Sequence, residues 1–348
     1  MAVSTSSGRR AGWATRWSRR IAVGAVLAAT CGTLCTAAGD DDAALRATAF
    51  LAREVPRWSR VNGCFSCHNN GDAARALFAA ERTFGSNRTT AGVGAEAAAA
   101  LDDTLGWLAR PERWAAGGTN EAFRDKRLAR LQFASALAAA VEAGRIRDRS
   151  ILTRAADLVA ADQAEDGSWP IDDSGLAGSP AAYGPVLATA VARRTLRDAD
   201  PARFAAAIAR ADRYLRARPI ASVVDAASSL FAIDQPPAAT DVARARAALD
   251  LLARGQHRDG GWGPYPTAPT EPFDTALALL SLATRGRDRA EVDAMIARGR
   301  ASLAASQLED GGWVETTRPA GGVSYAQRIS TAGWAALALI ATRPKARD

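Results

Sequence analysis

The heptapeptide QLEDGGW, residues 307–313, has the form Q-x-x-x-G-x-W, and the same form recurs at residues 163–169 (QAEDGSW) and 256–262 (QHRDGGW). Each copy follows a stretch whose apolar residues have helical spacing, and a second stretch of that kind follows each copy. The Asp-Gly pair inside the heptapeptide is typical of a tight turn. Recurrence at long intervals therefore predicts a repeat protein whose unit is a pair of helices joined by this turn.

A second recurrent feature, an arginine followed by a small residue, marks the starts of the repeats. These starts are Arg46-Ala47, Arg154-Ala155, Arg210-Ala211 and Arg298-Gly299, and Trp107-Leu108 marks a further degenerate copy. The fuller pattern resembles the QW repeat of squalene–hopene cyclases and related prenyltransferase-type toroids. The resemblance covers almost the whole chain after residue 38 and implies an all-α fold, a single (α/α)6 toroid of the terpenoid cyclase kind.

Six helix pairs account for the chain after its first segment. First helices are expected at roughly 42–55, 92–109, 148–163, 200–217, 239–255 and 289–306, and second helices at roughly 71–84, 121–144, 179–197, 219–233, 270–285 and 326–342. Because no hairpin of this kind buries its apolar stripe alone, six of them are expected to close into a ring around a shared core.

The Gln and Trp residues of the repeats are expected to be structural rather than catalytic. The amide is expected to satisfy carbonyl groups at the end of the first helix, which lack partners within the helix. The Trp ring is expected to pack over the Gln and against the start of the next helix. The residues concerned are Gln163, Trp169, Gln256, Trp262, Gln307 and Trp313.

The N-terminal segment, residues 1–38, has the composition of a secretory signal. Five arginines precede the apolar run IAVGAVLAATCGTLCTAA, which ends in small residues, so we expect cleavage near Ala38 and a periplasmic or secreted toroid at 39–348. Arg19-Arg20 also suggests twin-arginine export as an alternative to the Sec route. An uncleaved membrane anchor is the competing interpretation, since about 18 apolar residues approach the length that spans a bilayer.

Loss of this segment removes most of the formal charge of +7. The 44 basic residues fall to 39, against 37 acidic residues, so the exported chain is close to neutral. The high isoelectric point therefore gives no reason to expect a nucleic-acid partner. Membrane association is not indicated beyond the signal segment.

The connection of the first helix pair contains Cys64, Cys67 and His68 in the order C-x-x-C-H. This order is the attachment signature of c-type haem, in which two thiols bond the macrocycle and the adjacent imidazole binds its iron. Export agrees with this interpretation, because haem c is attached outside the bacterial cytoplasm. We therefore expect covalent haem c on the rim of the ring, on the face that carries the other connections.

Other interpretations of the motif stay open at this point. Cys64 and Cys67 would form a tight disulfide in an oxidising compartment. Zinc would need Cys64, Cys67, His68 and the distant His257, although adjacent Cys67 and His68 bind one ion awkwardly. Coincidence is the third interpretation.

The sequence also offers a candidate for the sixth ligand of the iron. His257 is the best candidate, because it lies in the connection of the fifth repeat and so on the same face. Met295 is expected to be a core residue. Asn69 and Asn70 are expected either to hydrogen-bond a haem ligand or to cap the following helix.

The acid of the usual cyclases is absent from the sequence. Class II terpenoid cyclases use an Asp-x-Asp-Asp run, and this chain has only Asp40-Asp41-Asp42 and the pairs Asp102-Asp103 and Asp172-Asp173, which are expected to be solvated or capping. The protein prenyltransferases of this fold use an Asp, Cys and His zinc set, and no spare Cys remains. Standard cyclase chemistry is therefore in doubt even where the fold is shared.

Three functions follow from these observations. The first is electron transfer or haem-based redox chemistry beside an apolar cavity, with a redox partner protein and a hydrophobic or isoprenoid ligand. The second is a cyclase-like or isomerase-like enzyme that acts on isoprenoids with an unidentified acid. The third is a non-catalytic ligand-binding scaffold.

Overall fold

The computed structural model describes residues 28–85, 91–114, 126–171, 184–285, 290–316 and 322–344. Within these ranges the chain forms helices and no strand. Residues 1–27, which hold most of the expected signal segment, and Asp172-Asp173 lie outside the described residues. Cleavage near Ala38 stays a prediction.

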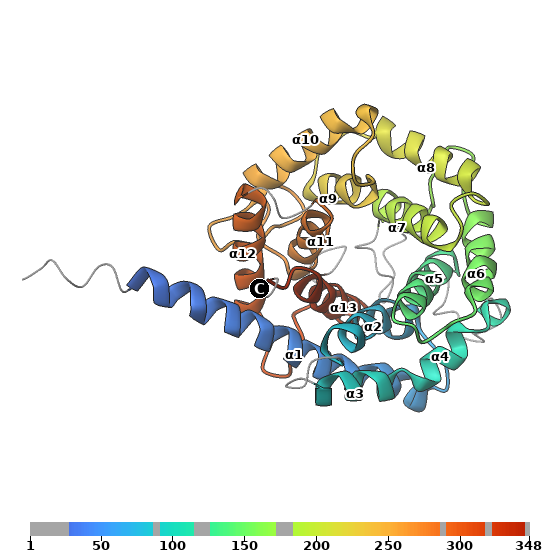
Figure 1. Cartoon of the computed structure of the whole chain (residues 1–348), viewed down its shortest axis with the longest axis horizontal. Coiled ribbons are helices and arrows are strands. Elements are labelled where there is room, and N and C mark those ends of the chain that lie inside the picture. Colours follow the sequence, from blue (N-terminus) through green and yellow to red (C-terminus); the bar gives the residue numbers. More distant parts are fainter. Residues whose placement is uncertain are drawn as a thin grey trace, which may run out of the picture.

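Two concentric layers of helices form a closed ring (Figure 1). The outer layer consists of α1 (Ala28–Asn62), α3 (Ala91–Ala100) with α4 (Asp102–Leu108), α6 (Arg149–Ala161), α8 (Ala205–Ala217), α10 (Ala239–Gly255) and α12 (Ala290–Ala305). The inner layer consists of α2 (Ala74–Phe84), α5 (Lys126–Glu142), α7 (Gly184–Ala199), α9 (Val223–Ala232), α11 (Pro272–Ala283) and α13 (Tyr325–Ala341). The predicted (α/α)6 toroid is confirmed.

The first repeat differs from its expected bounds at both helices. Its outer helix continues past Pro56 to Asn62, and Gly63, with φ 63°, ends it in the left-handed region that glycine adopts without strain. Its inner helix begins at His68, not near residue 71, as a six-residue π-helix, η1 (His68–Ala73), that leads into α2. The C-x-x-C-H run therefore enters the inner layer directly.

The second repeat differs in its outer helix, which is divided at Leu101. The backbone amide of Leu101 bonds to the Ala98 carbonyl, and a new helix, α4, starts with Asp102 and Asp103 in its first turn. Carboxylates are favourable at a helix N-terminus, so this pair favours the start of a new helix at Asp102. A short 3-10 turn, η2 (Pro111–Arg113), follows.

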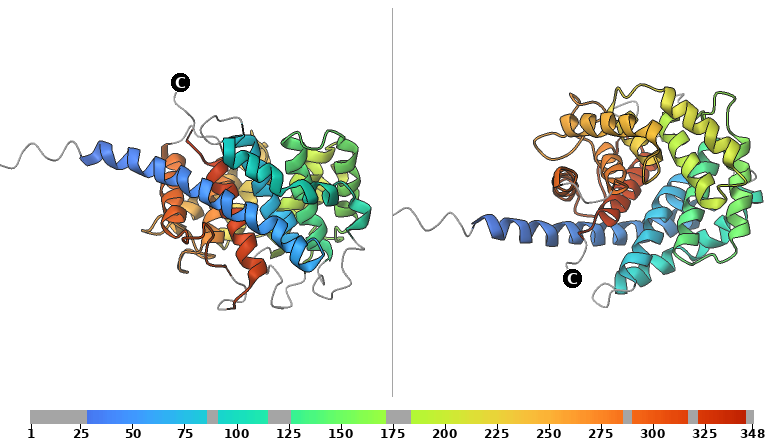
Figure 2. Two further views of the ribbon diagram at one scale, coloured as in Figure 1. Left: turned by 90° about the horizontal axis from the view of Figure 1, so that it is seen from below. Right: turned by 45° about the horizontal axis from the view of Figure 1, so that its top comes forward.

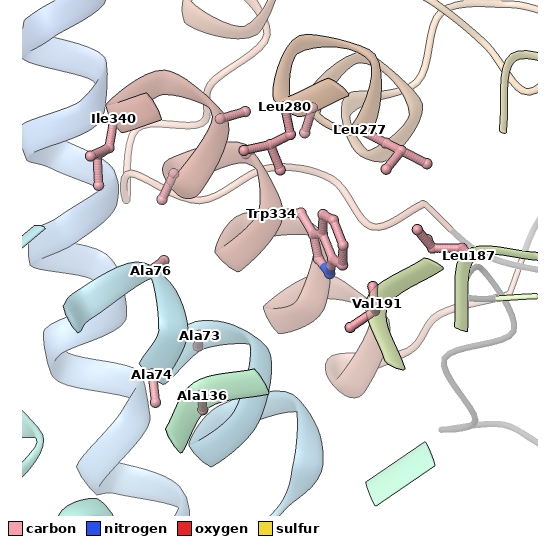
Figure 3. Packing of buried hydrophobic residues seen from close by; sticks show 14 of the residues in the cluster. Ala73, Ala74, Ala76, Ala136, Leu187, Val191, Leu277, Leu280, Trp334 and Ile340 are labelled. Atoms are coloured by element: carbon pink, nitrogen blue, oxygen red, sulfur yellow. The ribbon is translucent and has the colours of Figure 1, made fainter. Parts of the chain in front are cut away.

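The inner layer supplies most of the buried core. Its alanines allow helices to approach closely, and larger side chains fill the space between layers. Trp169, Trp262, Trp313 and Trp334 are among the largest fully buried side chains. Figure 3 shows Trp334 pointing from α13 toward the side of the ring that carries Leu187 and Val191.

The tryptophan of each repeat turn binds the end of its own outer helix. Each indole donates to a carbonyl ten residues earlier: Trp169 to Val159 (2.7 Å), Trp262 to Leu252 (2.8 Å) and Trp313 to Leu303 (2.9 Å). The prediction that the Gln amide satisfies the carbonyls of the first helix is wrong, because the indole takes that role. The amide is thereby left to act elsewhere.

The glutamine of each turn instead joins consecutive repeats. Its amide donates over 2.8–3.1 Å to two carbonyls, one in its own turn and one in the next outer helix: Gln163 to Gly167 and Ala207, Gln256 to Gly260 and Met295, Gln307 to Gly311 and Ala43. An arginine of that next helix donates back to the amide oxygen: Arg210, Arg298 and Arg46 respectively. The Gln307 bonds close the ring, because Ala43 and Arg46 belong to α1.

The N-terminal part of α1 projects beyond the ring, as Figures 1 and 2 show. The contacts of α1 with the rest of the ring begin with the buried Ala43 and Ala44 among the residues whose side chains are described. Over the described residues, none of the helices combines the length and the apolar character needed to cross a membrane.

Ring closure can be tested with two glycine substitutions. Gly311 has φ 92°, and a Cβ there would lie 2.5 Å from the Arg46 carbonyl oxygen, whereas Gly144 has φ 73° and a Cβ there would meet nothing within 4 Å. We expect Gly311→Ala to lower the free energy of unfolding by about 2 kcal/mol more than Gly144→Ala, measured by urea denaturation. Equal losses for the two variants would contradict this account of closure.

Candidate functional site

The C-x-x-C-H run lies in the connection between α1 and η1, at the N-terminal ends of the inner helices. Cys64 and Cys67 are present as thiols, and each is partly exposed. Ser66, between them, is buried, and its backbone amide donates to Asn70 Oδ1 at 2.9 Å. The thiols therefore face the rim while the following residues enter the interior.

Asn69 and Asn70 hold this connection against neighbouring helices. Asn69 Nδ2 donates to the Glu54 carbonyl of α1 at 2.9 Å, and Asn70 Nδ2 donates to Thr104 Oγ1 of α4 at 2.9 Å. Neither amide serves as a simple side-chain cap of the inner helix. They fix where His68 lies.

His68 is 7% exposed and is surrounded by aromatic rings. The Trp58 ring lies 4.9 Å from the imidazole centroid and the Tyr325 ring 5.8 Å from it, both edge to face. Burial lowers the pKa of His68 to about 3, so the imidazole is neutral. Its Nε2 atom is buried and has no hydrogen-bond partner.

These features fit the axial ligand of a haem. A neutral imidazole with an unused ring nitrogen is the form that binds iron, and a buried polar atom without a partner is costly unless a ligand satisfies it. The thiols precede it in the attachment order. Phe65 stacks on Trp107 at 4.9 Å and adds apolar surface beside the thiols. The donor set and its apolar surroundings suit a macrocycle.

The other metal ligands considered in the sequence do not join this set. Over the described part of the chain, no group of three or more His, Cys, Asp or Glu side chains is placed to hold a metal ion. His257 lies in the connection of α10 and α11, which the α12–α13 hairpin separates from the first repeat (Figure 1). The structure does not bring His257 to His68. Met295 is buried in α12, as predicted.

A central cavity of about 780 Å³ lies between the C-terminal halves of the inner helices. Its apolar wall includes Phe78, Val191, Phe231 and Leu280. Six arginines also line it, against three acids: Arg75, Arg82, Arg149, Arg193, Arg194 and Arg197, with Glu142, Asp198 and Asp234. The expectation of an apolar cavity beside the C-x-x-C-H run is therefore wrong on two points, because the cavity is partly basic and lies toward the other end of the ring.

Asp72 lies inside the ring between these two regions, four residues after His68 and three before Arg75. Its side chain is 2% exposed. Gln132 Nε2 from α5 and Ser330 Oγ from α13 donate to Asp72 Oδ2 at 2.6 and 2.8 Å. Three inner helices thus converge on one carboxyl group.

The protonation of Asp72 is set by burial. Desolvation raises the pKa of the carboxyl, and the attraction of Arg75 together with the hydrogen bonds acts in the opposite direction. A buried carboxyl with a raised pKa is suited to donate a proton. The sequence analysis missed this residue; its signal is an acid on a helix that is otherwise rich in alanine and apolar residues.

Among the other acids, Asp274 of α11 is fully buried in the inner layer. Asp102 and Asp103 lie in the exposed first turn of α4, as predicted, and Asp102 accepts a hydrogen bond from Arg145 at 3.1 Å. Two buried carboxyls therefore lie on inner helices within the described residues.

Comparison with known proteins gives likenesses of fold. No protein-family model and no curated protein matches the chain. The type II terpene cyclase MstE from Scytonema is similar in structure: an arginine variant in complex with its substrate, geranylgeranyl dihydroxybenzoate, has TM-score 0.60 and 14% identity, over 89% of this chain and 99% of that one. The apo form has TM-score 0.56 and 15% identity, over 87% and 97%.

A protein from Actinoplanes is similar to the same extent, with TM-score 0.57 and 17% identity over 88% of this chain and 100% of that one. The structural similarity establishes the terpenoid cyclase-like fold. Because the sequence identities are this low, the activity has to be argued from this chain's own residues.

The raised pKa of Asp72 predicts a pH dependence of stability. The native state binds more protons than the unfolded state above the ordinary pKa of 3.8, so the stability contributed by the neutral carboxyl is complete below that pH and is lost as pH rises through the native pKa. Because Asp72→Asn stays neutral, we expect its free energy of unfolding to increase relative to that of the wild type as the pH rises above 3.8.

Urea denaturation at a series of pH values measures this difference. The exposed Asp103→Asn is the control for the change of carboxylate to amide. If the difference in free energy of unfolding between Asp72→Asn and the wild type stayed constant with pH, folding would not change the pKa of Asp72.

Proposed function

We propose that this chain is a terpenoid cyclase-like enzyme that holds an isoprenoid-type chain in the central cavity and protonates it with Asp72. The observation that carries the proposal is the Asp72 carboxyl, whose pKa is raised by burial inside the ring and which lies one helical turn from Arg75 of the cavity wall. It supplies the acid that the missing Asp-x-Asp-Asp run would otherwise provide. The fold shared with MstE, whose structure holds geranylgeranyl dihydroxybenzoate, supports the substrate class.

The dimensions of the cavity support binding of such a chain. Its volume of about 780 Å³ falls in the range of sites for small molecules and cofactors, which is roughly 300–1,000 Å³. Phe78, Phe231 and Leu280 give an apolar wall that excludes water from a hydrocarbon. Arg75, which lines the cavity, follows Asp72 by one helical turn.

The proposed step is a simple proton transfer. The O–H bond of Asp72 breaks, its proton adds to one carbon of a substrate double bond, and the neighbouring, more substituted carbon becomes a cation. The electron pair of a second double bond then closes a ring onto that cation. The cyclised cation then loses a proton to solvent water, so the product is an isomer of the substrate and the step needs no oxidant or reductant. The hydrogen bonds that Gln132 and Ser330 donate stabilise the Asp72 carboxylate left after transfer.

Substitution of Asp72 tests this function. We expect Asp72→Asn to lower turnover of prenyl substrates by about a thousandfold, since removal of a general acid costs roughly 10²–10⁴ in rate. Product would be followed by gas chromatography and mass spectrometry, and substrate binding by thermal shift. Asp274→Asn, at the other buried carboxyl, is the matched comparison.

Loss of turnover in Asp274→Asn but not in Asp72→Asn would move the acid to α11. Unchanged turnover in both variants would contradict the proposal that either carboxyl is the catalytic acid.

A second candidate function is supported by the orphaned Nε2 atom of His68. We propose that Cys64 and Cys67 bond haem c covalently and that His68 binds its iron. When bound, the group supplies one-electron redox chemistry. The residues of this chain bind it, keep the ligand neutral by burial and exclude water through Trp58 and Tyr325.

Haem attachment would also imply a cellular location and a redox partner. We propose that residues 1–38 are a cleaved signal peptide and that the toroid, 39–348, works in the periplasm or outside the cell. A redox partner protein would then exchange electrons at the rim, where the thiols are partly exposed.

The haem proposal predicts a covalent adduct. Chain expressed with haem-attachment machinery is expected to gain the mass of one haem and to show a Soret band that survives acid–acetone extraction. The double variant Cys64→Ala/Cys67→Ala is expected to lose both, and His257→Ala to keep both. A mature wild-type chain of polypeptide mass alone would contradict the proposal.

A further inference from the structure

The lining of the cavity has two arginines whose charge the protein leaves incompletely matched. Arg193 is paired with Asp212 and Asp234, Arg197 with Asp234, and Arg82 with Glu142. These pairs account for half of the lining arginines. The remaining ones are the exposed Arg149, and Arg75 and Arg194 within the cavity.

Arg75 is 7% exposed, yet no ion pair joins it to a carboxylate among the described residues. Its guanidinium lies 4.2 Å over the Trp334 ring and donates to Ser135 Oγ at 3.2 Å, and its Nε atom is buried without a hydrogen-bond partner. A buried cation in this state is costly unless an anion completes its shell. Asp72, the nearest acid along its helix, forms no ion pair with Arg75, and burial raises the pKa of its carboxyl.

Arg194 approaches the same space from α7. Its guanidinium lies 4.8 Å over the Phe231 ring, and the ion pair that it makes with Asp198 among the described residues has the long distance of 3.9 Å. The side chain is 44% exposed, but desolvation lowers the pKa of Arg194. A side chain that is accessible but poorly solvated is typical of a cation in a cavity, whereas a cation on the outer surface is well solvated.

The two guanidinium groups act on one another. Repulsion from Arg75 contributes to the lowered pKa of Arg194, although α5 lies between their helices. Each group rests on an aromatic ring, which leaves its N–H donors available at the edge. Ser135 of α5, which accepts a hydrogen bond from Arg75, lines the same cavity.

We propose that Arg75 and Arg194 bind the anionic head group, a carboxylate or a phosphate, of a ligand whose apolar chain fills the cavity. Guanidinium groups match both anions in geometry. Phe78, Val191 and Leu280 line the adjoining wall and accept the chain. This inference deepens the proposed function and rests on it for the isoprenoid nature of the chain.

Binding measured by isothermal titration calorimetry tests the proposal with three probes: farnesyl diphosphate, farnesol and palmitate. We expect Arg194→Gln to weaken binding of the anionic probes about tenfold, the loss of one charge-assisted contact, and to leave farnesol unchanged. Arg75→Gln is expected to act in the same way. Arg203→Gln is the matched control, because Arg203 also lies over a phenyl ring, that of Phe204, but pairs with Asp157 on the outer layer.

The outcomes separate the head group from the chain. Equal affinity for farnesyl diphosphate and farnesol, with no effect of Arg194→Gln on either, would overturn the head-group site and leave the proposed function standing. Binding of palmitate alone, dependent on Arg194, would support the site and overturn the isoprenoid substrate. Binding of none of the three probes would overturn both.

Discussion

The amide of Gln307 joins the last hairpin of the chain to the first, and the rest of the structure depends on that closure. It donates to the Ala43 carbonyl of α1, and Arg46 of the same helix donates back to it. The same exchange joins two earlier pairs of consecutive repeats. Because an open row of hairpins would leave two apolar ends in water, closure lets the inner helices face one another instead of solvent.

An enclosed inner layer changes the chemistry of the ionisable groups within it. In the first inner helix, burial disfavours the charged form of both ionisable groups. It lowers the pKa of His68 and raises the pKa of Asp72. Arg75 stays beside the cavity with an aromatic ring as its main neighbour. An imidazole nitrogen without a hydrogen-bond partner, an acid and a cation thus occur in order along the first inner helix, from His68 to Arg75.

The architecture could be predicted from the sequence because the repeat turns require Gln, Gly and Trp at a spacing that few other structures require. Gln, Gly and Trp at 307, 311 and 313 each have a distinct partner, and a positive φ at Gly311 admits no side chain against Arg46. The partner of the amide was predicted wrongly, since periodicity locates a helix end but not the neighbouring repeat that contacts it. Asp72 and the arginines escaped prediction for the same reason: their environment comes from helices far apart in sequence, such as α5 and α13 around Asp72.

Two glycines account for the exclusion of water from Asp72. A Cβ at Gly71 would lie 2.8 Å from Gln132 Cβ, and a Cβ at Gly333 would lie 3.0 Å from the Asp72 backbone. Their absence of side chains lets α5 and α13 close on η1 from two sides, which brings Gln132 and Ser330 to the carboxyl. The π-helical turn that holds Asp72 also starts at His68, so packing that buries the acid also buries the imidazole. The raised pKa of one group and the lowered pKa of the other are therefore consequences of the same close approach of three helices.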